Sequence, residues 1–225
     1  MSIVYHKEVI QGSDEWLSAR CGMLTASEVK HIITPTLKVA SNDKERRQLY
    51  ELLSQRITGY VAPGYVSDDM LRGEDEEIEA RKLYARHFED VAECGMITND
   101  EWGFTLGYSP DGLVGDNGLI EIKSRCQKYQ VQTILEAKMP DEYLIQVQTG
   151  LLVSQRKWCD FILYCGGMPM FVIRIAPDKS VQDAIVAAAT VFHTKLNERR
   201  SEYEESVKRF KLIPTQRTER KEMYL

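Results

Sequence analysis

Apolar residues recur at helical spacing in the first third of the chain and again near its end. A short helix is predicted over 14–20 around Trp16, and a longer amphipathic helix over 43–58 that Gly59 ends. The residues expected to face inward from the longer helix are Leu49, Leu52, Leu53 and Ile57. Three further helices are predicted over about 67–90, 141–155 and 179–210.

The period changes to two in the middle of the chain, where apolar and polar residues alternate as they do in half-buried strands. Strands are predicted over 95–99, 102–108, 119–124, 159–164 and 170–175. The combination predicts an α/β or α+β fold in which helices flank a central mixed β-sheet. Because no repeat or Pro/Gly/Ser-rich linker divides the chain, we expect residues 1–225 to form one domain with a helical N-terminal part and a long C-terminal helix.

The most informative segment is a turn signal flanked by acidic residues. Asp111 precedes it, the turn is centred on Asn117-Gly118, and Glu121 and Lys123 follow on the next strand. An Asn-Gly pair between apolar residues favours a hairpin, which would bring Asp111 beside Glu121. Since side chains alternate along a strand, Glu121 and Lys123 share one face. An isolated Glu-x-Lys is usually a surface ion pair, but here apolar residues alternate with the two charges, so the opposite face is apolar.

Two carboxylates and a lysine are the groups needed for metal-assisted phosphodiester hydrolysis. We expect Asp111 to bridge two Mg²⁺ ions, for which Mn²⁺ can substitute, and Glu121 to ligate one of them. The carbonyl oxygen of Ile122 is a further candidate ligand, and Lys123 would orient or activate the attacking water. The EF-hand calcium loop is excluded, because its glycine position, counted from Asp111, holds Asp116.

The composition is that of a globular protein, with 28% charged and 43% hydrophobic residues. We find no apolar run long enough to span a bilayer and no signal-peptide core at the N-terminus, so no membrane association is expected. Five cysteines without a Cys-x-x-Cys pair favour reduced thiols and therefore a cytoplasmic location. The four histidines have no zinc-type spacing.

The net charge of −5 argues mildly against a nucleic-acid partner, but the distribution of charge matters more than its sum. Acidic residues concentrate between positions 68 and 79. Basic residues concentrate at the C-terminus, at Lys208, Arg209, Lys211, Arg217, Arg220 and Lys221. This tail is either a solvated end or an arm that contacts phosphates.

An anion pocket is predicted near the N-terminus. Thr25-Ala26-Ser27-Glu28 has the pattern of a capping box, and an apolar stripe follows it over 29–33. Thr25 would cap a helix and leave Ser27 near free backbone N–H groups, which attract phosphate. Arg20 lies just upstream and can bind a phosphate with both arms of its guanidinium. A surface arginine is the alternative interpretation of Arg20.

Several separated motifs together resemble the phage lambda exonuclease family of viral recombination nucleases, which includes YqaJ-like viral recombinases and belongs to the PD-(D/E)xK superfamily. The Asp/Glu-x-Lys trio alone is specific only to the superfamily, whereas the ordered set over about residues 16–155 is much more specific. In chain order the motifs are Arg20-x-Gly22-x-Leu24-Thr25-Ala26-Ser27-Glu28, Gly73 with Glu77 and Ala80-Arg81, Ser109-Pro110-Asp111-Gly112-Leu113 with Glu121-Ile122-Lys123, and Gln146-Val147-Gln148.

The resemblance implies a restriction-endonuclease-like core and a Mg²⁺-dependent 5′→3′ exonuclease on linear double-stranded DNA. Such an enzyme releases 5′ mononucleotides and leaves a 3′ single-stranded overhang for annealing-type recombination. The resemblance also implies a ring-shaped homotrimer that threads the duplex, a single-strand annealing protein as partner, and action in a bacterial host cell or from a prophage. Arg20, Ser27 and Ser109 match positions that hold the 5′-terminal phosphate. The alternatives are a structure-specific endonuclease of the superfamily and a non-catalytic DNA-end-binding module.

Three assignments on predicted helices stay open. Glu77 is an outer ligand or water-positioning acid, as the resemblance implies, or it forms an i,i+4 ion pair with Arg81. Gln146 is favoured over Gln148 as the site residue by the motif, and the two must face differently on a helix. Met70-Leu71 are either buried helix residues or exposed wedges that enter between terminal base pairs of DNA.

Overall fold

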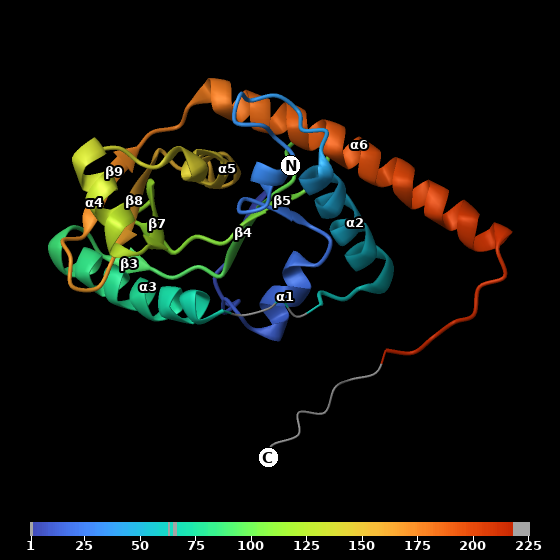
Figure 1. The fold of residues 1–225 in the computed structure, drawn as a ribbon, viewed down its shortest axis with the longest axis horizontal. Coiled ribbons are helices and arrows are strands. Elements are labelled where there is room, and N and C mark those ends of the chain that lie inside the picture. Colours follow the sequence, from blue (N-terminus) through green and yellow to red (C-terminus); the bar gives the residue numbers. More distant parts are fainter. Residues whose placement is uncertain (1, 63, 65–66, 218–225) are drawn as a thin grey trace, which may run out of the picture.

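The computed structural model describes residues 2–62, 64 and 67–217. Two residues of the predicted basic tail, Arg220 and Lys221, lie outside the described residues. Helices pack around two β-sheets (Figure 1). The predicted α/β class with mixed strand pairing is confirmed, but the strands expected in one central sheet are divided between two.

The first sheet is assembled mainly from the N-terminal half of the chain. Its strand order is β1-β4-β5-β2. The β2–β5 pair is parallel and the other pairs are antiparallel. Its strands are β1 (Ile3–His6), β2 (Leu24–Thr25), β4 (Met96–Asn99) and β5 (Leu106–Tyr108).

The second sheet has the order β3-β6-β7-β8-β9, in which only β7 and β8 run parallel. The predicted hairpin is its centre, because β6 and β7 pair antiparallel with Gly112 opposite Ile120. Its strands are β3 (Val91–Ala92), β6 (Gly112–Val114), β7 (Gly118–Ser124), β8 (Trp158–Tyr164) and β9 (Phe171–Ile175).

Four of the helices begin at residues whose side chains accept hydrogen bonds from the first turn, namely Ser13, Asn42, Ser67 and Asp178. The helices are α1 (Asp14–Arg20), α2 (Asp43–Thr58), α3 (Asp68–His87), α4 (Gln127–Glu136), α5 (Leu144–Ser154) and α6 (Lys179–Arg209), with 3-10 turns η1 (Val29–His31) and η2 (Asp141–Tyr143). Gly59 ends α2 in the left-handed conformation, with φ of 63°. All the helices predicted from periodicity are present, whereas the strands β1, β2 and β3 and the helix α4 were not predicted, and β6 was implied only by the predicted hairpin.

Two local predictions are wrong. Thr25 does not cap an α-helix, because its backbone pairs with Gly107 at the edge of the first sheet and only the 3-10 turn η1 follows. Ile57 does not face the core, since it is 39% exposed near the end of α2. For Thr25 a local pattern was overridden by backbone pairing with a distant segment.

Strand β7 is buried on both of its faces. Ile120 and Ile122 pack with Ala80 and Tyr84 of α3 in one apolar cluster. Leu119 belongs to the other cluster, in which α5 and α6 pack against the sheets. The charged residues between these apolar positions are therefore carried into the interior of the molecule. Within the described ranges, none of the helices combines the length and apolarity needed to cross a bilayer.

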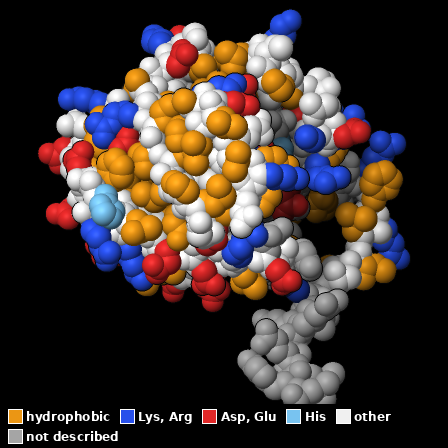
Figure 2. Space-filling view, turned by 60° about the vertical axis from the view of Figure 1, so that its left-hand side comes forward, with side chains coloured by type: hydrophobic (Ala, Val, Ile, Leu, Met, Phe, Trp, Pro, Cys, Tyr) orange, Lys and Arg blue, Asp and Glu red, His pale blue; other side chains and the backbone are white. Residues whose placement is uncertain are grey.

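An apolar surface is left uncovered on α4. Val131, Ile134 and Leu135 are 46%, 37% and 80% exposed, and Figure 2 shows hydrophobic side chains gathered on the face that α4 and β9 present. The buried side chains of this helix are instead polar, at Gln130 and Thr133. Exposed apolar patches of this kind mark interaction surfaces.

A buried carboxylate, Asp160 of β8, should be important for stability. It is 3% exposed and accepts hydrogen bonds from the Tyr84 hydroxyl at 2.6 Å and from Nε and Nη2 of Arg174, both at 2.8 Å. Replacing Asp160 with alanine leaves these donors without their acceptor. We expect the free energy of unfolding to fall by about 2–4 kcal/mol in urea titrations.

An exposed ion pair gives the control. Asp183 pairs with Lys179 across one turn of α6, at 2.6 Å. Asp183→Ala should lower the free energy of unfolding by less than about 1 kcal/mol. If the two variants lost equal amounts of unfolding free energy, the buried network around Asp160 would stabilise the fold no more than an exposed ion pair does.

Candidate active site

The turn between the two sheets carries the first acidic residue of the site. Strand β5 of the first sheet ends at Tyr108, and strand β6 of the second sheet begins at Gly112. The segment Ser109-Pro110-Asp111 therefore links the two sheets. Oδ2 of Asp111 accepts a hydrogen bond from the backbone N–H of Ile122 at 2.5 Å. The hairpin thus brings Asp111 beside the Glu121-Ile122-Lys123 segment, as its turn signal predicts.

Glu121 is held by three donors. It is 1% exposed, and its Oε1 lies 2.6 Å from Nζ of Lys123 and 2.5 Å from Nε2 of Gln146 on α5. The Tyr108 hydroxyl donates to Oε2 at 2.9 Å. The three donors lie on strand β5, strand β7 and helix α5. Together these elements fix the orientation of the Glu121 carboxylate.

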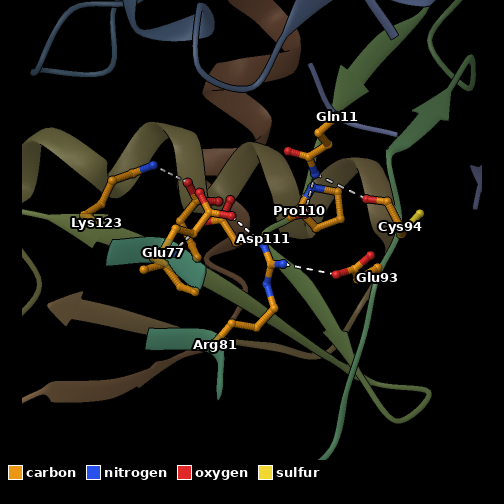
Figure 3. A network of polar contacts seen from close by, with 10 residues as sticks. Gln11, Glu77, Arg81, Glu93, Cys94, Pro110, Asp111 and Lys123 are labelled. Atoms are coloured by element: carbon orange, nitrogen blue, oxygen red, sulfur yellow. Dashed lines mark hydrogen bonds and ion pairs between the residues drawn. The ribbon is translucent and has the colours of Figure 1, made fainter. Parts of the chain in front are cut away.

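A third carboxylate comes from α3. Figure 3 shows Glu77 close to Asp111, with Arg81 below them in this view. Glu77 also pairs with Arg81 at 2.5 Å, and Arg81 reaches Glu93 at 3.3 Å. Glu77 therefore lies at the site and also forms the i,i+4 ion pair with Arg81, so the two interpretations of this residue are compatible. Glu76 turns the other way, toward the Ser124 hydroxyl and the Gly166 N–H.

These charges shift one another's protonation. Burial, and then the neighbouring Glu121, raise the pKa of Asp111 well above its ordinary value. Burial also raises the pKa of Glu77, although Arg81 and Lys123 oppose it. Burial lowers the pKa of the Lys123 ammonium, but Glu121 and Asp111 more than offset that, and the pKa lies above its ordinary value. The site therefore has a surplus of carboxylate charge that a bound cation would neutralise.

The predicted anion-pocket residues also lie together, although no α-helix N-terminus is present there. Nη1 of Arg20 lies 3.3 Å from Oγ of Ser109, and Nη2 lies 3.1 Å from Oγ1 of Thr25. Oγ of Ser27 is 3.3 Å from the same Thr25 oxygen. The Trp16 ring lies under the guanidinium at 4.2 Å and donates from Nε1 to Ser109 at 2.9 Å. The polar groups come from a guanidinium and hydroxyls, not from a helix end.

Comparison with known proteins places this arrangement in a family. A model described as the YqaJ-like viral recombinase domain matches residues 15–157, which is more than half of the chain. The chain belongs to this family. The match includes every site residue predicted from the sequence, and the family resemblance read from the motifs is confirmed.

Solved structures agree with the assignment to the YqaJ-like family. An alkaline exonuclease, LHK-Exo from Laribacter hongkongensis, is 32% identical, with a TM-score of 0.78 over 88% of this chain and 99% of that one. The same protein in complex with dAMP gives a TM-score of 0.79 at the same identity and coverage. A phage related exonuclease from Haemophilus somnus 129PT shares the fold at 15% identity, with a TM-score of 0.55 over 79% of this chain and 96% of that one. No curated protein matches the chain.

The YqaJ-like domain offers hard oxygen donors for a metal ion. Within the described part of the chain no cluster of three or more His, Cys, Asp or Glu side chains has metal-binding geometry. The oxygen donors that the structure brings together are the carboxylates of Asp111 and Glu121, and the Ile122 carbonyl stays a predicted ligand. Oδ1 of Asp111 accepts no hydrogen bond from a described residue, which leaves it available. Oxygen donors of this kind fit Mg²⁺ or Mn²⁺.

Met70 and Leu71 lie in the first turn of α3 and are not buried. Their side chains are 53% and 52% exposed. The interpretation of both residues as buried helix residues is therefore wrong. Their insertion between terminal base pairs of DNA stays a prediction.

Two residues of the site were missed by sequence reasoning, and a third was given another role. Tyr108 and Trp16 contact Glu121 and Ser109, and Thr25, which was expected to cap a helix, contacts Arg20. Tyr108 directly precedes the Ser-Pro-Asp motif, and Gly150 on α5 gives its ring room, since a Cβ there would lie 2.7 Å from the ring. These contacts join distant segments, so only the position of Tyr108 beside the motif could have signalled its role.

Gln146 and Gln148 face different surroundings, as their spacing on α5 requires. Gln148 donates to the carbonyl of Ala176 at 2.8 Å and accepts from the N–H of Asp178 at 2.8 Å, away from Glu121. Gln146→Ala removes the contact with Glu121 and should lower the cleavage rate about tenfold to a hundredfold. Gln148→Ala should lower the urea unfolding midpoint but not the rate per folded molecule. A larger rate loss in the Gln148 variant would reverse the assignment.

Proposed function

We propose that this YqaJ-like domain is a DNA exonuclease that degrades linear double-stranded DNA from the 5′ end. It would release 5′ mononucleotides and leave a 3′ single-stranded overhang for annealing-type recombination. The observation that carries the proposal is the convergence of Asp111, Glu121 and Lys123 in one site, beside a separate pocket built around Arg20. The kinship with an alkaline exonuclease supports the same activity.

The residues of the site have distinct proposed tasks. Asp111 and Glu121, with the Ile122 carbonyl, would hold two Mg²⁺ ions, which supply charge stabilisation for the attacking and leaving oxygens of the scissile phosphate. Gln146 and Tyr108 keep the Glu121 carboxylate in one orientation. Lys123 would orient or activate the attacking water, and the expected loss of its proton beside a metal charge stays a prediction. Glu77 of α3 would position water or act as an outer metal ligand.

Polarity is proposed to come from the Arg20 pocket. A terminal phosphate carries more negative charge than an internal diester, so a guanidinium among hydroxyls distinguishes a strand end from its middle. Arg20, Ser27 and Ser109 would hold the 5′-phosphate. Each cleavage that leaves a new 5′-phosphate regenerates this ligand and draws the strand forward. Met70 and Leu71, exposed at the start of α3, would separate the terminal base pair.

Replacing Arg20 with alanine tests this pocket. Wild-type protein should begin degradation faster on 5′-phosphorylated ends than on 5′-hydroxyl ends. Arg20→Ala should remove most of that preference, about tenfold to a hundredfold in initiation rate, because a charge-assisted contact is lost. The measurement is initial nucleotide release from paired duplexes that differ only in the 5′ group.

The matched control for Arg20 is another arginine. Arg46 is exposed on α2 and pairs with Asp43 at 3.3 Å. Arg46→Ala should leave the preference unchanged. Equal wild-type rates on the two kinds of end would contradict the pocket assignment.

Assembly and partners belong to the same proposal. A homotrimer that encircles DNA needs apolar contact surfaces, and the exposed patch on α4 is a candidate. A single-strand annealing protein would take up the 3′ overhang. The described part of the basic tail, which includes Lys208, Arg209, Lys211 and Arg217, would contact DNA phosphates.

The activity itself is tested by comparing substrates. Linear duplex should be degraded when Mg²⁺ is present, whereas a covalently closed circle should stay intact. Cutting of the circle would favour a structure-specific endonuclease. Binding without any turnover in Mg²⁺ or Mn²⁺ would favour a DNA-end-binding module.

A further inference from the structure

A cavity of about 480 Å³ lies between α2 and α6 and is separate from the carboxylate site. Its walls include Arg56 of α2, His193 of α6, the loop 21–23 and the loop 103–105. This volume is within the usual range for small-molecule sites, about 300–1,000 Å³. Among the described residues that line it, Arg56 is the one permanent cation and no carboxylate is present.

The Arg56 guanidinium is only partly satisfied. Its Nε donates to the carbonyl of Gly22 at 2.8 Å, and Nη2 lies 3.5 Å from Nδ1 of His193. Two other basic residues on α6 have acidic partners. Lys195 pairs with Glu45 at 2.9 Å, and Arg200 pairs with Glu204 at 3.1 Å. Arg56 has no acidic partner among the described residues. Burial lowers its pKa and the neighbouring charge of Arg200 lowers it further, which is the sign of uncompensated positive charge.

His193 adds a second donor without an acceptor. It is 6% exposed and stacks on Phe104 with ring centroids 4.3 Å apart. Burial, and then Arg56, lower its pKa to about 4, so the ring is neutral at pH 7. Because Nδ1 faces an Arg56 donor, the ring proton belongs on Nε2, and Nε2 has no hydrogen-bond partner among the described residues. A buried donor without an acceptor is costly.

The cavity is joined to the Arg20 pocket by a short loop. Gly22 has φ of 68°, and a Cβ there would lie 2.5 Å from Cγ of Arg56. Only glycine allows the chain to cross the arginine so closely. The Gly22 N–H donates to Oε1 of Gln55 at 2.8 Å. The loop that carries Arg20 is thus anchored on α2 directly beside Arg56.

We propose that this cavity is a second phosphate-binding site, in which Arg56 binds a phosphate group of a DNA strand or of a free mononucleotide. An arginine fork matches two phosphate oxygens, and such a ligand supplies the negative charge that Arg56 lacks, while the buried His193 ring lies beside it. The Thr105 and Asn197 side chains on its wall can add polar contacts. The inference goes beyond the proposed exonuclease activity and does not rest on it.

The His193 ring reports occupancy of this cavity and not of the Arg20 pocket. The full-length protein, labelled with ¹⁵N and free of metal, is titrated at constant ionic strength with inorganic phosphate, a 5′ mononucleotide or a short duplex with 5′-hydroxyl ends. Imidazole ¹⁵N resonances are followed, and His193→Gln identifies the signal. The His193 resonances should shift and saturate with at least one probe. If the mononucleotide saturates the shift, the ligand of the cavity is a free nucleotide. If only the duplex does so, the ligand is a phosphate of the DNA backbone.

A matched pair of variants keeps the test specific. Thr194 lies on the exposed rim of the cavity, and Thr194→Glu places a carboxylate there while Thr194→Gln adds the same volume without charge. The glutamate variant should weaken binding about tenfold or more relative to the glutamine variant, because it competes for Arg56. Arg56→Gln should abolish the His193 shift, and Arg20→Gln should retain it.

Three results would overturn the proposal. They are the absence of a saturable His193 shift with every probe, equal affinities in the Thr194 pair, and loss of the shift in Arg20→Gln but not in Arg56→Gln. Arg56 would then be a structural bridge between α2 and the Gly22 loop. None of these measurements involves cleavage, so their failure is distinct from failure of the exonuclease proposal.

Discussion

Asp111→Asn is expected to abolish DNA cleavage while DNA binding stays close to that of the wild type. Asparagine keeps the size of the side chain and can still accept the hydrogen bond from the Ile122 N–H. It removes the negative charge that the proposed metal ions require. Loss of several kcal/mol of transition-state stabilisation predicts a fall in rate of about a thousandfold or more.

The same substitution should not destabilise the fold. The folded-state pKa of Asp111 is raised, so its charge costs stability, and that cost grows as the pH rises from the unfolded-state pKa through the folded-state value. Without metal, Asp111→Asn should therefore unfold at an equal or higher urea concentration than the wild type at pH 7. Asp116→Asn, in the exposed turn of the hairpin, is the control and should change neither rate nor stability. Wild-type cleavage by the Asp111 variant would refute the metal-site assignment.

Lys123→Met should impair the chemical step and leave DNA affinity nearly unchanged. The methionine retains the apolar stem but loses the ammonium that lies 2.6 Å from Oε1 of Glu121. Loss of a group that orients or activates water predicts a fall in single-turnover rate of about a hundredfold to ten-thousandfold. The buried Glu121 also loses its cation, so the variant should unfold more easily than the wild type.

Binding and chemistry must be measured separately for Lys123. Fluorescence anisotropy of a labelled duplex gives affinity, and rapid quench with enzyme in excess gives the rate of cleavage. Lys128→Met, on the exposed face of α4, is the matched control and should alter neither. An unchanged rate combined with weaker binding would make Lys123 a phosphate anchor instead.

The hairpin and the helices with strong caps were predictable because their signals are local. Asn117-Gly118 between apolar residues gives the turn, and the alternation around Glu121 gives the shared face with Lys123. The ends of α2 follow from Asn42 and Gly59. Each of these depends on neighbours within a few positions along the chain.

The failures have tertiary causes. Thr25 forms the edge of a sheet because Gly107 offers it a backbone partner, and no residue near Thr25 signals this. Helix α4 shows no inward apolar stripe, since its buried positions are polar and its apolar residues are exposed. The division into two sheets occurs within the three residues between β5 and β6, which is too short a segment for periodicity to detect. Tyr108 acts on Glu121 across that same division.

The most direct test of the central claim is a digest of one linear duplex with a label at either end of the same strand. The duplex has 5′-phosphorylated ends and is incubated with wild-type protein with and without Mg²⁺. The proposed function predicts that the 5′ label leaves first as a mononucleotide, that the 3′ label stays with the strand until late, and that both events require Mg²⁺ and Asp111. Early release of the 3′ label, or equal release by Asp111→Asn, would contradict it.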